Sequence, residues 1–217
     1  TIALVVGAGS AVLAVISATF IRPLPFADEA HLVWVYAKPP NTGGVERQNP
    51  LHSTSFVRFR ERLQQFEGVG GTWERERALD VGGAAEVVTS AGISANYFDV
   101  LALRPAAGRM FTPDEDVSDA RVAVISHAFW QARLGGETAL GRKMVIDGAA
   151  FEVIGVMPPM PVVGFAGAEV YTPLAIHAGN MPVPASTIVA AIGRLKPGVS
   201  PARASDEIAA VMRDVVR

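Results

Sequence analysis

The chain has 217 residues, of which 50% are hydrophobic and 18% are charged, and its formal net charge at pH 7 is −2. This composition is too hydrophobic for a disordered chain, and it provides no basic field of the kind that holds nucleic acid. The absence of cysteine excludes disulfide bonds, thiolate metal sites and a cysteine nucleophile.

The first 21 residues carry no charge, and the first charged residue is Arg22. About 20 apolar residues are enough to cross the hydrocarbon core of a bilayer as a helix. Small residues recur at every fourth position, at Ala3, Gly7 and Ala11, which would let another membrane helix approach closely. We therefore predict a transmembrane helix over residues 1–21.

Three other interpretations of this segment stay open: a cleaved signal peptide, a buried helix of a soluble protein, and a dinucleotide-binding turn. In the third, Gly7-Ala-Gly9 would form the glycine turn, and Asp28 or Glu29 would bind the ribose. The fingerprint is incomplete, because Val12 stands where it requires Gly or Ala. An oxidoreductase that uses a nucleotide cofactor is therefore kept as an alternative.

After this segment the first predicted strand covers residues 32–36. A helix is expected to begin at Ser53 or Ser55, either of which can act as its N-cap, and to run to about Gln65. Glycines at positions 68, 70 and 71 are expected to end it. Its apolar side chains fall at helical spacing and are expected to be core residues: Phe56, Phe59, Leu63 and Phe66.

Two similar units follow, each a strand that leads into a short helix through a serine. Ser94 and Ser126 are the expected N-caps, because a serine side chain can accept a hydrogen bond from the first turn of a helix. Gly135-Gly136 is expected to end the second helix. The two units are strand 86–93 with helix 94–101, and strand 121–125 with helix 127–134.

A β-hairpin is predicted next, with strands over residues 142–146 and 150–156. Its turn is Asp147-Gly148, a dipeptide that tolerates positive φ at both positions.

The last part of the chain begins with a passage rich in proline and glycine over residues 158–184. A strand is predicted over residues 188–195, and a final helix is expected to start at Pro201 with Ser200 as its cap. The chain stops at Arg217 on this helix, so we expect the protein to continue beyond it.

No segment satisfies the pattern of a catalytic, cofactor or metal site. Gly136 to Lys143 has the glycine spacing of a phosphate loop, but it lacks the Lys and Ser or Thr that the motif requires. Ser126 and His127 are neighbours, which favours a helix cap beside a surface histidine over a nucleophile and base. Asp114 to Asp116 lacks the rest of a calcium loop and is expected to be a solvated turn. The histidines are widely separated: His31, His52, His127 and His177.

Taken together, these segments resemble the periplasmic core domain of MacB-like ABC-transporter permeases. The resemblance covers nearly the whole chain in order and rests on seven pieces. They are Arg22–Phe26 after the apolar helix, Phe56–Arg60 leading to Phe66–Gly68, Val87–Leu101, Arg104–Phe111, Val122–Ser126 with Phe129-Trp130, Leu140-Gly141 into the hairpin ending at Pro159, and Gly193–Gly198.

The resemblance implies a mixed α/β (α+β) fold with two domains, a transmembrane helix at residues 1–21 and a two-lobed extracytoplasmic core domain at residues 22–217. One lobe would carry βαβ-like units, and the other would be formed largely by the middle of the chain. The domain would lie on the periplasmic side of the inner membrane. The expected partners are an ATP-binding cassette subunit or domain, a second permease copy, a possible periplasmic adaptor and the lipid membrane, with no nucleic acid.

The predicted function is therefore that of a permease fragment, which couples cytoplasmic ATP hydrolysis to the export or extraction of a substrate. No enzyme activity, catalytic residue, cofactor or metal is expected of the chain itself. Besides the oxidoreductase, a membrane-anchored sensory or adhesive domain remains an alternative.

Overall fold

The computed structural model describes residues 31–35, 51–80, 83, 85–118, 120–160, 167–176 and 188–215. The strands in these ranges are β1 (Leu32–Val35), β2 (Leu51–His52), β3 (Phe66–Asp80), β4 (Ala85–Ile93), β5 (Ala107–Gly108), β6 (Val122–Ile125), β7 (Lys143–Ile146), β8 (Ala149–Val156), β9 (Val170–Pro173) and β10 (Ile188–Leu195). The helices are α2 (Ser53–Arg60), α3 (Tyr97–Val100), α4 (Pro113–Val117), α5 (His127–Leu134) and α6 (Pro201–Val215).

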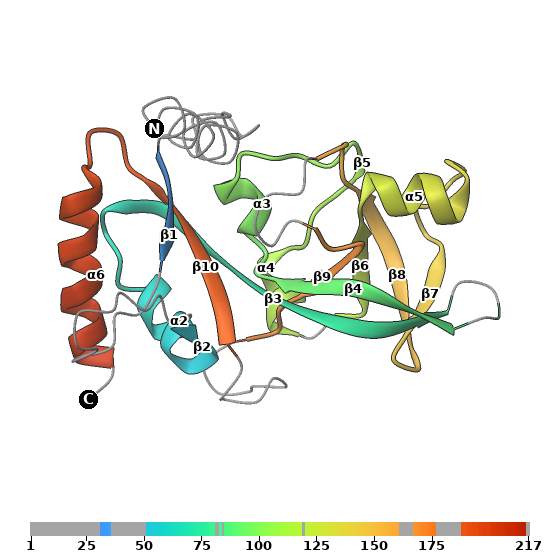
Figure 1. Ribbon diagram of the computed structural model, residues 1–217, viewed down its shortest axis with the longest axis horizontal. Helices are drawn as coiled ribbons and strands as arrows, with labels where there is room; N and C mark the ends of the chain where they lie inside the picture. Colours follow the sequence, from blue (N-terminus) through green and yellow to red (C-terminus); the bar gives the residue numbers. More distant parts are fainter. Residues whose placement is uncertain are drawn as a thin grey trace, which may run out of the picture.

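The strands form one sheet in the order β1-β10-β3-β4-β9-β6-β8-β5, with β2 paired to β10 and β7 paired to β3 and β8. Most pairs are antiparallel, whereas β4–β9 and β6–β8 are parallel. The first lobe contains β1, β2, β10, α2 and α6, and the second lobe contains β5 to β8 and α5 (Figure 1). The second lobe, formed by the middle of the chain, contains a βαβ-like unit, β6-α5-β8, whereas such units were expected in the other lobe. The predicted mixed α/β fold is confirmed.

A single strand, β3, runs through both lobes. Its first half, residues 66–72, pairs with β10, and its second half, residues 72–80, pairs with β4. In Figure 1 this strand extends along the length of the molecule between α6 and the β7–β8 hairpin. Because one continuous strand belongs to both lobes, their relative position is set by the backbone of the sheet.

The expected end of α2 was wrong. The helix ends at Arg60, and Phe66 and the glycines at 68, 70 and 71 lie inside β3. A Cβ on Gly70 would stand 2.9 Å from Cα of Tyr97, and a Cβ on Gly71 would stand 2.5 Å from the Phe56 ring. The glycines are therefore required by close packing on the strand, and they do not end a helix.

Three hydrophobic clusters form the core. The first-lobe cluster includes Phe56 and Phe59 of α2, and Trp73 of β3 packs against it. The second-lobe cluster includes Leu79 and packs α5 on β6 and β8. Trp73 and Leu79 are six residues apart in β3, so their side chains point to the same face of the strand. These two clusters therefore lie on the same side of the sheet. The central cluster, which includes Phe98, covers the other side and touches both lobes.

Several predicted elements are confirmed. The Ser126 side chain accepts a hydrogen bond from the Phe129 N–H at 3.1 Å, and Gly135 ends α5 in the left-handed region. The Asp147-Gly148 turn has φ values of 48° and 78°, and the hairpin has the expected strands. The Ser200 side chain accepts from the Arg203 N–H at 3.3 Å at the start of α6.

The sequence analysis missed two strands that hold the sheet together. β3 was not predicted at all. β9 lies in the proline- and glycine-rich passage at residues 158–184, where no strand was predicted. β9 joins the lobes, because it pairs in parallel with β4 and antiparallel with β6. Such a short strand, fully buried between two others, shows no alternation that a sequence pattern could detect.

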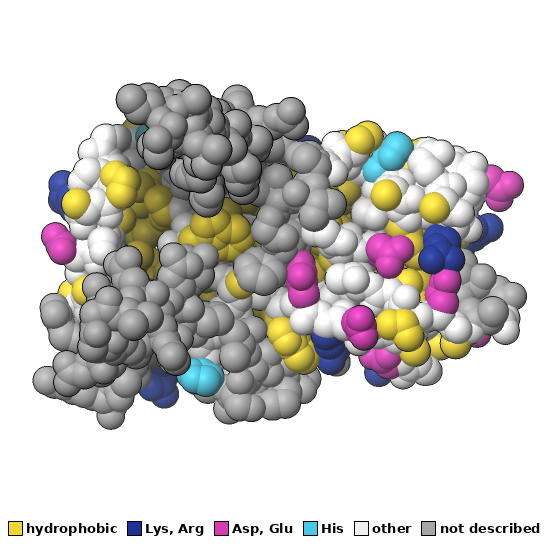
Figure 2. Space-filling model, viewed as in Figure 1, with side chains coloured by type: hydrophobic (Ala, Val, Ile, Leu, Met, Phe, Trp, Pro, Cys, Tyr) yellow, Lys and Arg dark blue, Asp and Glu magenta, His cyan; other side chains and the backbone are white. Residues whose placement is uncertain are grey.

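Within the ranges described above, no helix has the length and apolarity needed to cross a membrane. The predicted transmembrane helix over residues 1–21 lies outside those ranges. So do the Gly7-Ala-Gly9 turn and the acidic pair Asp28 and Glu29. Figure 2 shows side chains of both charges on the lobe that carries α5, and hydrophobic side chains between α6 and β1.

Candidate functional site: the joint around α4

The segment before α4 is pressed against the edge of the second lobe. β5 pairs with the end of β8, and the Arg109 N–H donates to the Ile154 carbonyl at 2.9 Å. Gly108 has a φ of 73°, and a Cβ there would overlap the Ile154 carbonyl oxygen. A Cβ on Gly155 would likewise overlap the carbonyl oxygen of Arg109. Both glycines are therefore needed for the two backbones to meet.

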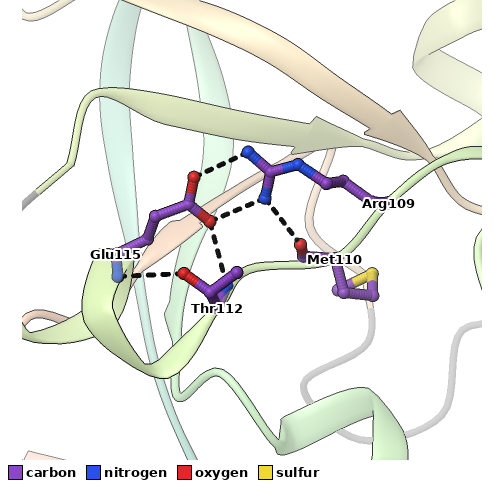
Figure 3. Close-up of polar contacts among 4 residues, drawn as sticks. All are labelled: Arg109, Met110, Thr112 and Glu115. Atoms are coloured by element: carbon purple, nitrogen blue, oxygen red, sulfur yellow. Dashed lines mark hydrogen bonds and ion pairs between the residues drawn. The ribbon is translucent and has the colours of Figure 1, made fainter.

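Arg109 and Glu115 form a two-pronged ion pair beside this contact (Figure 3). The two guanidinium nitrogens Nη1 and Nη2 donate to Oε2 and Oε1 of Glu115, both at 2.7 Å, and Nη1 also donates to the Met110 carbonyl at 3.1 Å. The hydrogen bond from Arg109 outweighs burial and lowers the pKa of Glu115 below its ordinary value. The pair fixes the start of α4 on the second lobe.

Thr112 and Glu115 close a capping box at the N-terminus of α4 (Figure 3). The Glu115 N–H donates to Thr112 Oγ1 at 3.2 Å, and the Thr112 N–H donates to Glu115 Oε2 at 2.9 Å. Pro113 occupies the first helical position, where its missing N–H costs nothing. One glutamate therefore serves both the helix cap and the ion pair to Arg109.

Asp116 of α4 joins three segments that are distant in the sequence. Its side chain is buried, with an exposure of 6%. Oδ2 accepts from the Ala95 N–H at 3.2 Å, directly after β4, and Oδ1 accepts from the Ala175 N–H at 3.0 Å, shortly after β9. Burial raises the pKa of Asp116 above its ordinary value, although both backbone hydrogen bonds favour the charged form.

The Asp116 position corrects the expectation of a solvated turn at residues 114–116. Residues 114–116 belong to the helix α4, and the last of these acidic residues, Asp116, is buried. The signal that could have revealed this was the Thr112-Pro113-Asp114-Glu115 sequence, which has the spacing of a capping box with proline at the first position. The partners of Asp116 are backbone N–H groups, which carry no side-chain signature in a sequence.

Ser94 was expected to cap α3 and does not. The N-cap of α3 is Asn96, which makes no capping hydrogen bond with its side chain. Ser94 Oγ instead accepts from the Gly71 N–H at 3.0 Å and donates to Asn96 Oδ1 at 2.8 Å, and Asn96 Nδ2 donates to the Val69 carbonyl at 3.1 Å. These bonds satisfy the edge of β3 where β4 turns away. The turn that carries Ala95 is thereby held to the first half of β3.

These contacts define the joint: Arg109, Thr112, Glu115, Asp116, and the Ser94–Asn96 turn. Its hydrogen bonds connect the second lobe, through α4, to the turn against β3 and to the end of β9. The carboxylates of Glu115 and Asp116 are occupied as acceptors within the protein. This arrangement is suited to holding elements in place, and it offers no activated nucleophile or proton donor.

The other candidate residues are not brought together into a site. Ser126 is occupied as a helix cap, and the His127 ring lies against Trp130 with a centroid distance of 5.5 Å. Residues 136–143 connect α5 to β7, a strand, as predicted. Among the described residues, no group of three or more His, Asp or Glu could hold a metal ion. His177 lies outside those residues.

Known proteins resemble this chain in both sequence and fold. The family of MacB-like periplasmic core domains matches residues 1–211. The macrolide export ATP-binding/permease protein MacB of Aggregatibacter actinomycetemcomitans is 33% identical over 76 residues. The aligned part is 35% of this chain and only 12% of that relative's length.

Three crystal structures share the fold at low sequence identity. The periplasmic region of MacB from Actinobacillus actinomycetemcomitans has a TM-score of 0.68 at 18% identity, and covers 85% of this chain and 84% of that one. The extracellular domain of the noncanonical ABC-type transporter YknZ from Gram-positive bacteria has a TM-score of 0.62 at 17% identity. The alignment covers 84% of this chain and 93% of that one. A permease-protein domain from Porphyromonas gingivalis has a TM-score of 0.63 at 18% identity. The alignment covers 89% of this chain and 84% of that one.

The match over residues 1–211 contains the joint, both lobes and the apolar N-terminal segment. The expected resemblance is thus confirmed by the sequence and by the fold. The chain belongs to the family of MacB-like periplasmic core domains, which are extracytoplasmic domains of ABC-transporter permeases.

Proposed function

We propose that this chain is the first transmembrane helix, residues 1–21, and the outer domain, residues 22–217, of an ABC-transporter permease. The permease works with a cytoplasmic ATP-binding cassette, fused or separate, and with a second permease copy. ATP hydrolysis in the cytoplasm drives a motion of the outer domain that exports a substrate or extracts it from the membrane. A periplasmic adaptor is a further candidate partner.

The family match carries this proposal, because it includes the apolar segment that a dinucleotide-binding interpretation would require for a cofactor. The joint also supports it. A domain that transmits force between membrane helices needs stiff connections, and β3 and α4 provide a continuous strand and a network of paired polar groups. The oxidoreductase and the sensory or adhesive domain gain no support from any of these contacts.

Membrane topology can be tested with a single introduced cysteine, since the 217 residues contain none. Val87 is 67% exposed on β4, so Val87→Cys should leave the fold intact. In intact cells that express the full-length protein, we expect a membrane-impermeant maleimide to label this cysteine. The protein without the substitution is the control for background labelling. Labelling only after the inner membrane is permeabilised would contradict an extracytoplasmic location.

Transport coupling requires the complete protein. We expect the full-length permease, purified in detergent, to contain or to co-purify with an ATP-binding cassette and to hydrolyse ATP. Substitution of the cassette's catalytic carboxylate should abolish that hydrolysis. A membrane-anchored protein with correct topology but no associated ATPase would favour the sensory or adhesive alternative.

A further inference from the structure

A groove separates the first-lobe and second-lobe clusters on the face of the sheet that both occupy. Its volume is about 290 Å³, just below the usual range for small-molecule sites, which suits a small ligand. One wall contains Trp73 and Leu174, which belong with the first-lobe cluster, and the other contains Ile146 and Phe151, which belong with the second. Gly92 lies between the walls and contributes no side chain.

Three arginines and one aspartate also line the groove. Arg77, with a side-chain exposure of 9%, donates from Nε to Asp147 Oδ2 at 2.7 Å, so its charge is paired. Arg75 and Arg121 have no such partner among the residues that the structure describes. The groove therefore holds an excess of two positive charges next to apolar walls.

Both unpaired guanidinium groups lie near aromatic rings. The Arg75 guanidinium carbon is 4.5 Å from the Trp73 ring centroid, and that of Arg121 is 5.9 Å from the Phe151 ring centroid. A planar guanidinium next to a ring keeps its N–H groups free at the edge, where they can donate two parallel hydrogen bonds to an oxyanion. The rings offer an adjacent apolar surface to the rest of a ligand.

Electrostatics in the groove favour an anion. Burial, followed by the charge of Arg77, lowers the pKa of the Arg75 guanidinium below its ordinary value, while Asp147 acts in the opposite sense. A bound anion would oppose both unfavourable effects. Uncompensated cations in a hollow with low-dielectric walls also concentrate negatively charged solutes.

We propose that this groove binds a small organic anion, in which a carboxylate, sulfonate or phosphate is attached to a planar apolar group. Arg75 and Arg121 bind the oxyanion, and Trp73 and Phe151 contact the apolar part. The proposal does not depend on the direction of transport or on coupling to ATP. It assigns a ligand site to a groove that adjoins the joint at Ala175, whose N–H binds Asp116, but whose arginines and aromatic rings take no part in the joint.

The test is isothermal titration of the full 217-residue chain in nanodiscs of neutral lipid, with 2-naphthoate as the probe and protein-free nanodiscs as the blank. Acetate carries the charge without the ring, and 2-naphthalenemethanol carries the ring without the charge. We expect 2-naphthoate to bind at least about tenfold more tightly than either, and its affinity to fall as salt is raised.

Arg75→Gln combined with Arg121→Gln should weaken 2-naphthoate binding by at least about tenfold. Both side chains are exposed, and unchanged thermal unfolding will confirm that the variant is folded. Arg133→Gln on α5, outside the groove, is the matched control and should bind like the parent.

Three results would overturn the proposal. Equal binding of 2-naphthoate by the double variant, or equal binding of 2-naphthalenemethanol by the parent, would show that the arginines do not recognise a charge there. In a separate arm, retention on anionic phosphatidylglycerol vesicles that requires Arg75 and Arg121, with no binding of free 2-naphthoate, would assign the groove to lipid headgroups instead. Failure of the topology test would leave this binding result unaffected.

Discussion

The two halves of β3 belong to one strand but are stabilised in different ways. In residues 66–72, three glycines allow α3 and α2 to pack directly on the backbone. Residues 74–77 are four consecutive charged residues, and Arg77 forms an ion pair with Asp147 of the hairpin turn. The first half depends on close packing against its backbone, whereas the second half contains an ion pair to the hairpin turn. A strand can therefore connect two lobes while it meets a different environment in each.

Each half also adjoins an aspartate, one buried and one exposed, with a different type of partner. Asp116 near the glycine half accepts only from backbone N–H groups, and burial raises its pKa. Asp147 in the charged half is also subject to burial, but the hydrogen bonds from Arg77 and the Ala78 N–H outweigh it and lower its pKa. The two aspartates should therefore respond to pH in opposite senses.

The largest effect is expected from Gly70→Val. The new Cβ would stand 2.9 Å from the Tyr97 Cα, and backbone cannot move aside as a flexible side chain can. We expect the free energy of unfolding to fall by about 3 kcal/mol, measured by urea denaturation. Glu76→Val on the exposed charged half is the matched control, with an expected change within about 0.5 kcal/mol. Equal losses from the two variants would contradict the distinction between the halves.

Asp116→Asn should have the next largest effect. An amide can accept only one of the two N–H groups and turns its own donors toward the other, so we expect a loss of about 2 kcal/mol at pH 7. The folded-state pKa of Asp116 is raised, so its contribution is complete below the ordinary pKa near 3.9 and declines as pH rises through the folded pKa. The stability difference from the parent should accordingly be greatest at acidic pH. A difference that grows with rising pH would refute this assignment.

Asp147→Asn should cost less, about 1 kcal/mol at pH 7, because the aspartate is 46% exposed and solvent screens its charge. Asparagine tolerates the positive φ of this turn and keeps an acceptor for the Ala78 N–H. The substitution therefore removes chiefly the negative charge that pairs with Arg77. The folded-state pKa is lowered, so the contribution is present above the ordinary pKa and is lost as pH falls. Denaturation curves from pH 7 to pH 3 should converge for parent and variant, opposite to the trend for Asp116→Asn.

The smallest effect is expected from Arg133→Ala. Arg133 Nη1 lies 2.5 Å from Glu86 Oε2 of β4, but the two side chains are 40% and 36% exposed. We expect a change of no more than about 0.5 kcal/mol in the free energy of unfolding. A loss as large as that of Asp147→Asn would mean that the exposed Arg133–Glu86 ion pair stabilises the fold as much as the Arg77–Asp147 ion pair does.

Local sequence patterns predicted the elements whose signals are contained in a few neighbouring residues. The Asp147-Gly148 turn and the Ser126 cap were correct, because the positive φ values and the capping hydrogen bond involve only residues close in the chain. The same reasoning failed at Gly70 and Gly71. Their role depends on Tyr97, Phe56 and Val189, which no local window contains.

The sequence by itself predicted that the chain folds, the cap at Ser126, the β-hairpin and the resemblance to the MacB-like family that the comparisons confirm. Tertiary structure alone decided the two-lobe path of β3, the burial of Asp116 and the meeting of three arginines in one groove. The reason is physical. Caps and turns are satisfied by nearby backbone groups, whereas burial and charge pairing depend on strands that are distant in sequence and meet only in the folded sheet.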